Sequence, residues 1–237
     1  MKKFFLSCIL VVTSLFADEC GDIIKKLVSI QNSIVQYSYQ NLQVGAWAKF
    51  TYGLAIYAGK REVDGKKLYG VELQPKPSLA LQTWYSIIPK KLAPGVTLLT
   101  LDPTILYVLD RGGHVIKLNK NMIELYYTFA MGGRENLSTI LTPAILNNPP
   151  RCDNRITIKK IQFTVQNRNI PSFLIVSQNS GGRLVVSDKV PFGIVASGDG
   201  SVEASLKLLD FGFHGKKPLI DEKKHRMAQE FSIHFGM

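Results

Sequence analysis

Apolar residues spaced three and four positions apart mark a helix near the beginning of the chain. Between Asp22 and Leu42 these apolar residues are Ile23, Ile24, Leu27, Ile30, Ile34 and Val35. This spacing places an apolar stripe along one side of a helix, and Asp22 is a suitable N-cap residue. The pattern therefore predicts one amphipathic helix over residues 22–42.

After Gly45 the spacing changes to the near-alternation that is typical of strands. A strand begins in AWAKFTYGLAIYAG, and REVDGKKLYGVEL follows with Asp64-Gly65 between two strand-like runs. Asp-Gly favours a type I′ hairpin turn, which needs positive φ at both central positions. Further runs are LALQTWYSII, which ends at Pro89, and TILYVLDRGGHVIKL, with a turn at Gly112-Gly113. The first half of the chain is thus predicted to be a meander of about five antiparallel strands.

The pattern is ambiguous between Asn119 and Pro150, where prolines interrupt the chain and we expect short helices or a covering segment. Strands resume with ITIKKIQFTV, SFLIVSQ, RLVVSD, FGIVAS and ASLKLLDFGF. The predicted breaks between them are Asn169-Ile170-Pro171, Gly181-Gly182 and Gly198-Asp199-Gly200. Within GGRLVVSDKVPFGIV, Pro191 lacks an N–H donor, so the ladder must be interrupted after the Asp188-Lys189 corner. The tail DEKKHRMAQEFSIHF suits a polar turn and one last strand.

These elements predict an α+β protein that is mainly antiparallel β. The expected architecture is a curved sheet or incomplete β-barrel with an N-terminal helix and a few short helices. No long linker divides the chain, so residues 18–237 are expected to form a single β-rich domain. A curved sheet with a helix against one face would enclose an apolar concavity.

The first residues have the order of a secretory signal peptide. Lys2 and Lys3 precede an apolar run over residues 4–16, and Ala17 is a suitable cleavage position. As a helix, the run spans only about 21 Å, which is short of the roughly 30 Å of a hydrocarbon core. Lipidation of Cys20 is disfavoured, because the two residues before it are acidic. We therefore expect removal of residues 1–17 and a periplasmic protein, with secretion or outer-membrane association as the alternative.

Composition adds two expectations to this picture. The 237 residues are 46% hydrophobic, so a sizeable core can form. The formal net charge of +11 is spread along the chain, which favours a solvated surface over a dedicated patch, with peripheral contact with an anionic membrane surface as the alternative. No nucleic-acid partner is expected, because no recognised binding motif is present. Once the signal is removed, Cys20 and Cys152 remain, and they form either a disulfide or two unpaired thiols.

Motifs that carry catalytic chemistry are missing from the sequence. It contains no HExxH, GxSxG, Walker or dinucleotide signature, and its four histidines lie far apart. Ser187 and Asp188 follow a strand-like run, where a turn explains them better than a catalytic role. No catalytic residue, metal site or cofactor is therefore predicted.

Aromatic residues are concentrated in the first strands. They have two interpretations, a filled core or the lining of a pocket for an apolar ligand. If a ligand pocket exists, the residues expected to line it are Trp47, Phe50, Tyr52, Trp84, Tyr85 and Tyr107. Strand alternation allows only some of them to face inward.

Two stretches carry a resemblance to a known group. The segment K-V-P-F-G-I-V, followed by a turn and L-L-D-F-G, and the segment REVDGKKLYGVEL with the following QTWY, resemble uncharacterised bacterial exported proteins. Those proteins are similar to the LolA/LolB lipoprotein-carrier superfamily, and the resemblance covers residues 44–110 and 160–215. It implies an incomplete antiparallel barrel around a hydrophobic cavity that accepts acyl chains. No arginine of this chain can be assigned the lipid-release role known in those carriers.

The function expected from these observations is non-catalytic binding. The chain would hold a lipid or another apolar small molecule in the concavity of its curved sheet. The alternative is an envelope structural or assembly protein that acts through contacts with a protein partner.

Overall fold

A computed structural model describes residues 21–118, 122–123, 156–178, 181–198 and 206–221. The expected signal peptide, Cys20, Cys152, nearly all of the segment 119–150 and the tail after Asp221 lie outside these residues. Residues 21–35 are α-helical, and the helix continues as a π-helix, η1, over Gln36–Gln40. The amphipathic helix predicted over residues 22–42 is therefore confirmed, and it ends two residues earlier.

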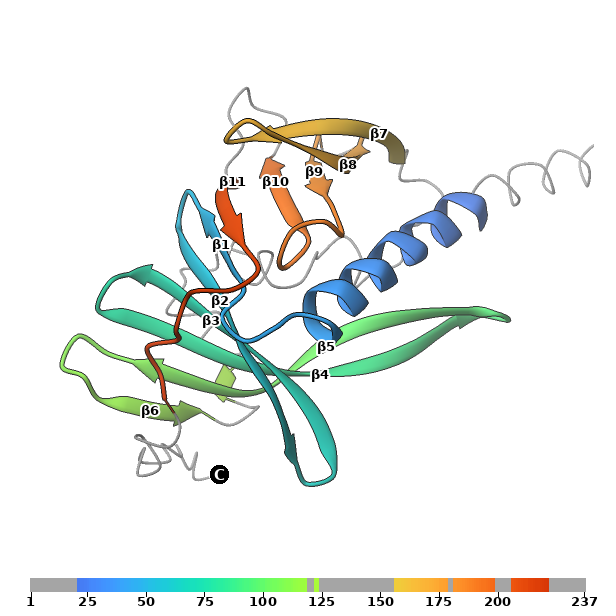
Figure 1. The fold of residues 1–237 in the computed structure, drawn as a ribbon. Coiled ribbons are helices and arrows are strands. Elements are labelled where there is room, and N and C mark those ends of the chain that lie inside the picture. The colour runs from blue at the N-terminus through green and yellow to red at the C-terminus, as the bar shows by residue number, and fades with distance from the viewer. Residues whose placement is uncertain (1–20, 119–121, 124–155, 179–180, 199–205, 222–237) are drawn as a thin grey trace, which may run out of the picture.

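The described strands form one antiparallel sheet of eleven strands (Figure 1). The strands of the first half are β1 Trp47–Phe50, β2 Gly53–Val63, β3 Lys66–Lys76, β4 Leu79–Ala93, β5 Val96–Leu109 and β6 Val115–Leu118. Those of the second half are β7 Ile156–Val165, β8 Arg168–Ser177, β9 Arg183–Val186, β10 Ile194–Gly198 and β11 Leu206–Gly212. Their order in the sheet is β6-β5-β4-β3-β2-β1-β11-β10-β9-β8-β7.

This order joins two meanders through the pairing of β1 with β11, and it leaves β6 and β7 at the two ends. The sheet is not closed. The predicted fold class, a mainly antiparallel curved sheet with an N-terminal helix, is therefore confirmed. The meander of the first half has six strands, because the stretch after Gly45 is divided into β1 and β2 by a turn at Thr51 and Tyr52.

The Asp64-Gly65 hairpin is confirmed in its detail. Val63 pairs with Lys66, and the two residues between them have φ of 51° and 71°, as a type I′ turn requires. Gly112-Gly113 likewise lies in the loop that joins the paired strands β5 and β6.

The break predicted at residues 169–171 is wrong, because the hairpin turn lies at Gln166 and Asn167, with φ of 45° and 65°. Strand β8 runs through Pro171, which stands opposite Gln162. Proline is tolerated here because β9 pairs with β8 only from Phe173 onward. The Pro171 carbonyl instead accepts a hydrogen bond from the Ser187 hydroxyl, 2.6 Å away.

The strand predicted to end at Pro89 continues to Ala93. Pro89 stands opposite Leu99, and the two strands β4 and β5 make a long hairpin that extends below the helix in Figure 1.

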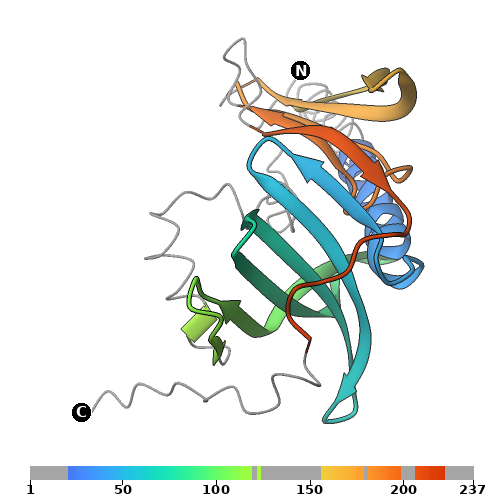
Figure 2. The ribbon, with the colours of Figure 1, turned by 60° about the vertical axis from the view of Figure 1, so that its left-hand side comes forward.

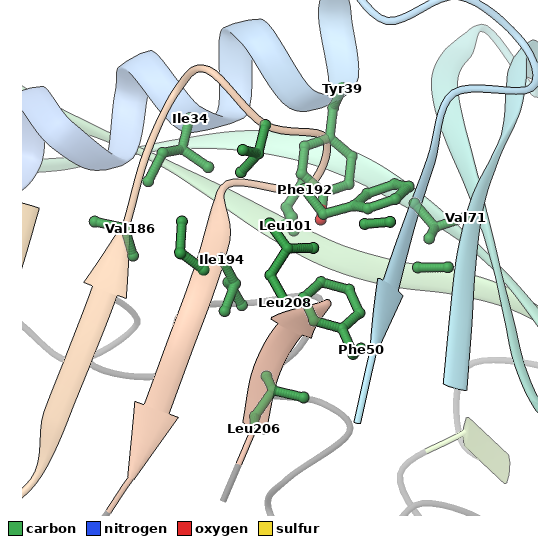
Figure 3. Packing of buried hydrophobic residues seen from close by; sticks show 14 of the residues in the cluster. Ile34, Tyr39, Phe50, Val71, Leu101, Val186, Phe192, Ile194, Leu206 and Leu208 are labelled. Atoms are coloured by element: carbon green, nitrogen blue, oxygen red, sulfur yellow. The ribbon is translucent and has the colours of Figure 1, made fainter. Parts of the chain in front are cut away.

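The helix packs on one face of the sheet, which we call the inner face. Figure 3 shows Ile34 and Tyr39 of the helix among buried side chains from both meanders. The labelled members of this core from the sheet and its loops are Phe50, Val71, Leu101, Val186, Phe192, Ile194, Leu206 and Leu208. The opposite, outer face is crossed by residues 213–221, so the helix and this C-terminal segment lie on opposite sides of the sheet (Figure 2).

The corner between β9 and β10 fills part of the inner face. Phe192 and Gly193 both adopt positive φ, 66° and 73°, and the chain turns back so that the Ser187 N–H donates to the Gly193 carbonyl. The interruption predicted at Pro191 is therefore present. Phe192 is 1% exposed and its ring lies beside Tyr39 (Figure 3).

Candidate functional site

Two of the six aromatic residues predicted to line a pocket lie on the inner face. Tyr85 contacts Tyr39 of the helix edge-on, with ring centroids 6.3 Å apart. Phe50 is 2% exposed and packs in the same core, close to Leu208 (Figure 3). Both side chains are thus part of the packing between the helix and the sheet.

Three others lie on the outer face. Trp47, Ile56, Glu72, Gln82 and Tyr107 are successive cross-strand partners over β1–β5, and they share one face because partners in register do. Trp84 lies two residues after Gln82 and therefore on that same face. Tyr52 is 53% exposed in the turn between β1 and β2. The six residues therefore do not form one lining.

The two tryptophans have a packing role on the outer face. A Cβ atom added at Gly70 would lie 2.9 Å from the Trp84 ring, and one added at Gly212 would lie 2.6 Å from the Trp47 ring. Each indole thus lies flat over a glycine of the neighbouring strand. Arg61 stacks on Trp84 from above, with its guanidinium carbon 4.0 Å from a ring centroid.

The inner face is mainly apolar across the first meander, with Thr83 as a buried polar exception. Ala55, Leu73, Leu81, Val108 and Ile116 are successive partners from β2 to β6. Among the buried polar and charged residues that the structure describes, Glu72 alone carries a carboxylate, and it belongs to the outer face. The described part of the inner face therefore buries no charged side chain.

Burial between the helix and the inner face keeps the hydroxyls of two tyrosines, Tyr39 and Tyr57, in their neutral form. The Tyr57 hydroxyl donates to the Tyr39 carbonyl at 2.6 Å, below the π-helical turn. Burial raises the pKa of Tyr39 and of Tyr57 far above the usual value of a tyrosine. These hydroxyls serve as hydrogen-bonding groups at physiological pH.

One turn of the helix is bonded to both meanders. The Asn32 side chain donates to the Thr97 carbonyl at 2.8 Å and accepts from the Leu99 N–H at 2.8 Å. Both bonds are made on the edge of β5 that faces away from β4. Strand β6 does not cover this edge at residues 97–99, because it pairs with β5 only at residues 106–109. The Ser33 hydroxyl donates to Asp188 at 2.8 Å, in the corner of the second meander.

Sequence analysis missed this polar turn, although a signal was present. Gln31, Asn32 and Ser33 are three consecutive polar residues within an apolar-striped helix. Gln31 follows Leu27 by four residues and precedes Ile34 by three, so it occupies a position of the apolar stripe. A polar residue at such a position is buried with the stripe and needs a partner there.

Apolar side chains that remain partly accessible occur at both ends of the inner face. In Figure 1 the helix lies between the β4–β5 hairpin and the β7–β8 hairpin. Partly buried apolar residues that pack against the core include five that we call the flank residues: Ile23 of the helix, Ile87 and Leu99 of the β4–β5 hairpin, and Ile158 and Phe173 of the β7–β8 hairpin.

Other kinds of site find less support in the described residues. They include no group of three His, Cys, Asp or Glu side chains arranged to hold a metal ion. Among them there is also no helix with the length and apolar character needed to cross a bilayer. Comparison with protein-family models and with curated protein sequences finds no match to this chain.

Proposed function

We propose that this chain is an exported, periplasmic and non-catalytic binding protein that holds a lipid or another apolar ligand on its inner face. One observation carries the proposal: an unclosed sheet has an apolar inner face, with partly buried apolar residues on both sides of the helix that crosses it. The resemblance of residues 44–110 and 160–215 to exported proteins that are similar to the LolA/LolB carriers adds support.

The ligand would be held mainly by burial of hydrocarbon. Transfer of one methylene group from water to an apolar surface contributes about 0.8 kcal/mol. Affinity should therefore rise about fourfold with each methylene of a straight chain, until the chain exceeds the site. Displacement of the fluorescent probe N-phenyl-1-naphthylamine by straight-chain alcohols of increasing length measures this dependence.

Variants of the flank residues test the location of the site. Leu99→Asp and Ile158→Asp each place a carboxylate on one flank, and both should weaken binding of the probe more than tenfold. Leu209→Asp is the matched control, because Leu209 is 39% exposed outside the core and should tolerate the change. Equal affinity in the flank variants and the control, or no uptake of any apolar probe by the wild type, would refute the proposal.

Export is tested separately. Mature protein recovered from a periplasmic fraction should begin at Asp18 when its N-terminus is sequenced. Intact Met1 in the recovered protein would contradict removal of the signal.

A second candidate function is a structural or assembly role through protein contacts. Strand β7 has one described neighbour in the sheet, β8, so its other edge is open to pairing within the described part of the chain. Lys159 and Lys160 are exposed on this strand. Co-purification of a stoichiometric protein partner, together with failure to take up lipid, would favour this function over the first.

A further inference from the structure

The buried side of the helix carries two polar side chains among its apolar residues. Gln31 and Ser38 are each 1% exposed. They are seven residues apart, which is about two turns, so they lie on the same side of the helix at a spacing of about 10 Å. This side also carries Leu27 and Ile34, which belong to the core of the inner face.

The orientation of the Gln31 amide is fixed by the sheet. Its Nε2 atom donates to the Leu99 carbonyl at 3.3 Å, beside the Asn32 bonds to the same strand. Rotation of the amide by half a turn would bring its oxygen against that carbonyl, and two acceptors repel each other. The Oε1 atom therefore points away from β5.

No donor within the described residues reaches Gln31 Oε1, and none reaches the Ser38 hydroxyl oxygen. A buried acceptor without a donor is disfavoured relative to an apolar side chain of similar shape. Leucine at position 31 would continue the stripe without this penalty. The glutamine thus holds an acceptor in the apolar interior, on the same amide group that bonds to Leu99 of the flank.

We propose that Gln31 Oε1 is the polar anchor of the ligand site and that the ligand is a neutral amphiphile with a hydrogen-bond donor. This inference rests on the function proposed above. A hydroxyl or amide N–H of the ligand donates to Gln31 Oε1, and its hydrocarbon part lies on Leu99 and Ile87. Ser38 offers a second polar contact two helical turns further along.

The chemistry of the anchor excludes two other ligand classes. A carboxylate of a fatty acid has only acceptor atoms, so it has nothing to donate to Gln31 Oε1. No buried lysine, arginine or histidine of the described inner face would offset its charge. A pure hydrocarbon would leave the acceptor buried and unpaired. Neutral alcohols, acylglycerols and fatty amides satisfy both requirements.

A matched pair of ligands tests this directly on the full-length mature protein. Dodecanol and dodecyl methyl ether share the chain and the oxygen, but only the alcohol can donate a hydrogen bond. In displacement of N-phenyl-1-naphthylamine, the wild type should bind the alcohol about tenfold more tightly than the ether. Gln31→Leu should bind both ligands alike. Gln36→Leu changes an exposed glutamine of the same helix and should keep the wild-type preference.

The outcomes separate the two proposals. If the wild type binds the alcohol and the ether equally, or if Gln31→Leu keeps the preference for the alcohol, the anchor is refuted while the binding function stands. If neither ligand displaces the probe, the binding function fails and the anchor fails with it. If Gln31→Leu does not fold, equal binding of the two ligands by the wild type still refutes the anchor.

Discussion

Replacement of Glu72 by glutamine is predicted to release residues 213–221 from the outer face of the sheet. Glu72 is fully buried, and its carboxylate accepts hydrogen bonds from the backbone N–H groups of Leu219 at 2.7 Å and Ile220 at 2.9 Å. Gln82 Nε2 donates to the Ile220 carbonyl at 3.0 Å. The Ile220 side chain is buried in a small cluster with Ala80, Val115, Tyr107 and Leu109.

The magnitude follows from two competing responses. If the segment stays in place, a Glu72→Gln variant loses one charge-assisted hydrogen bond, about 1.5–3 kcal/mol, and leaves a buried N–H unpaired, about 1–3 kcal/mol. If the segment detaches, the chain loses the burial of Ile220, about 1.5–3 kcal/mol, and the hydrogen bond from Gln82, about 1 kcal/mol. Detachment is the cheaper response, so the free energy of unfolding should fall by about 2.5–4 kcal/mol.

Urea unfolding and amide hydrogen exchange measure the two parts of this prediction. The Leu219 and Ile220 amides should exchange faster in the variant, and trypsin should cleave faster after the exposed Lys216. Glu62→Gln is the control, because Glu62 is an exposed glutamate of the neighbouring strand β2. Unchanged amide exchange with a stability within about 0.5 kcal/mol of the wild type would refute the role assigned to Glu72.

Two further predictions concern the inner face. In urea unfolding, Gly193→Ala should lower the free energy of unfolding by about 1–3 kcal/mol more than Gly65→Ala does. Both glycines have positive φ, but only at position 193 would the added Cβ meet a neighbour, Ile34 Cγ2 at 2.2 Å. Equal losses would contradict the close approach of the corner to the helix. Because burial raises the pKa of Tyr39 and Tyr57, the folded state holds these protons more tightly, so the contribution of the two tyrosines to stability should be constant below about pH 10 and fall above it. Tyr57→Phe should lessen this alkaline fall, and an identical pH dependence in the variant would count against it.

Much of the fold could be predicted because local rules agree with it. Asp64-Gly65 makes a type I′ turn wherever strands flank it, and the apolar stripe of residues 22–42 has no strand-like alternative. The misplaced turn near Pro171 shows where such rules stop. Proline is compatible with a strand if the neighbouring strand is short, and the length of β9 is set by the corner at 187–193, which no local pattern reveals.

The candidate site was less accessible to prediction, for a physical reason. Alternation states that Trp84 and Tyr85 point to opposite faces, but it does not state which face the helix covers. That choice depends on contacts between residues far apart in the chain, such as Tyr39 with Tyr85 and Ile34 with Gly193. Large aromatic side chains were expected on the inner face, whereas both tryptophans cover glycines on the outer one.

The helix also explains how an open sheet keeps its two halves together on the inner side. Asn32 and Gln31 bond to β5, and Ser33 bonds to Asp188, so four side-chain hydrogen bonds from a single helical turn join the two meanders. Each such bond contributes about 0.5–1.5 kcal/mol, which is far less than a ladder of paired strands provides in total. The same turn carries Gln31, so the residue proposed to recognise the ligand lies within the contacts that join the two meanders.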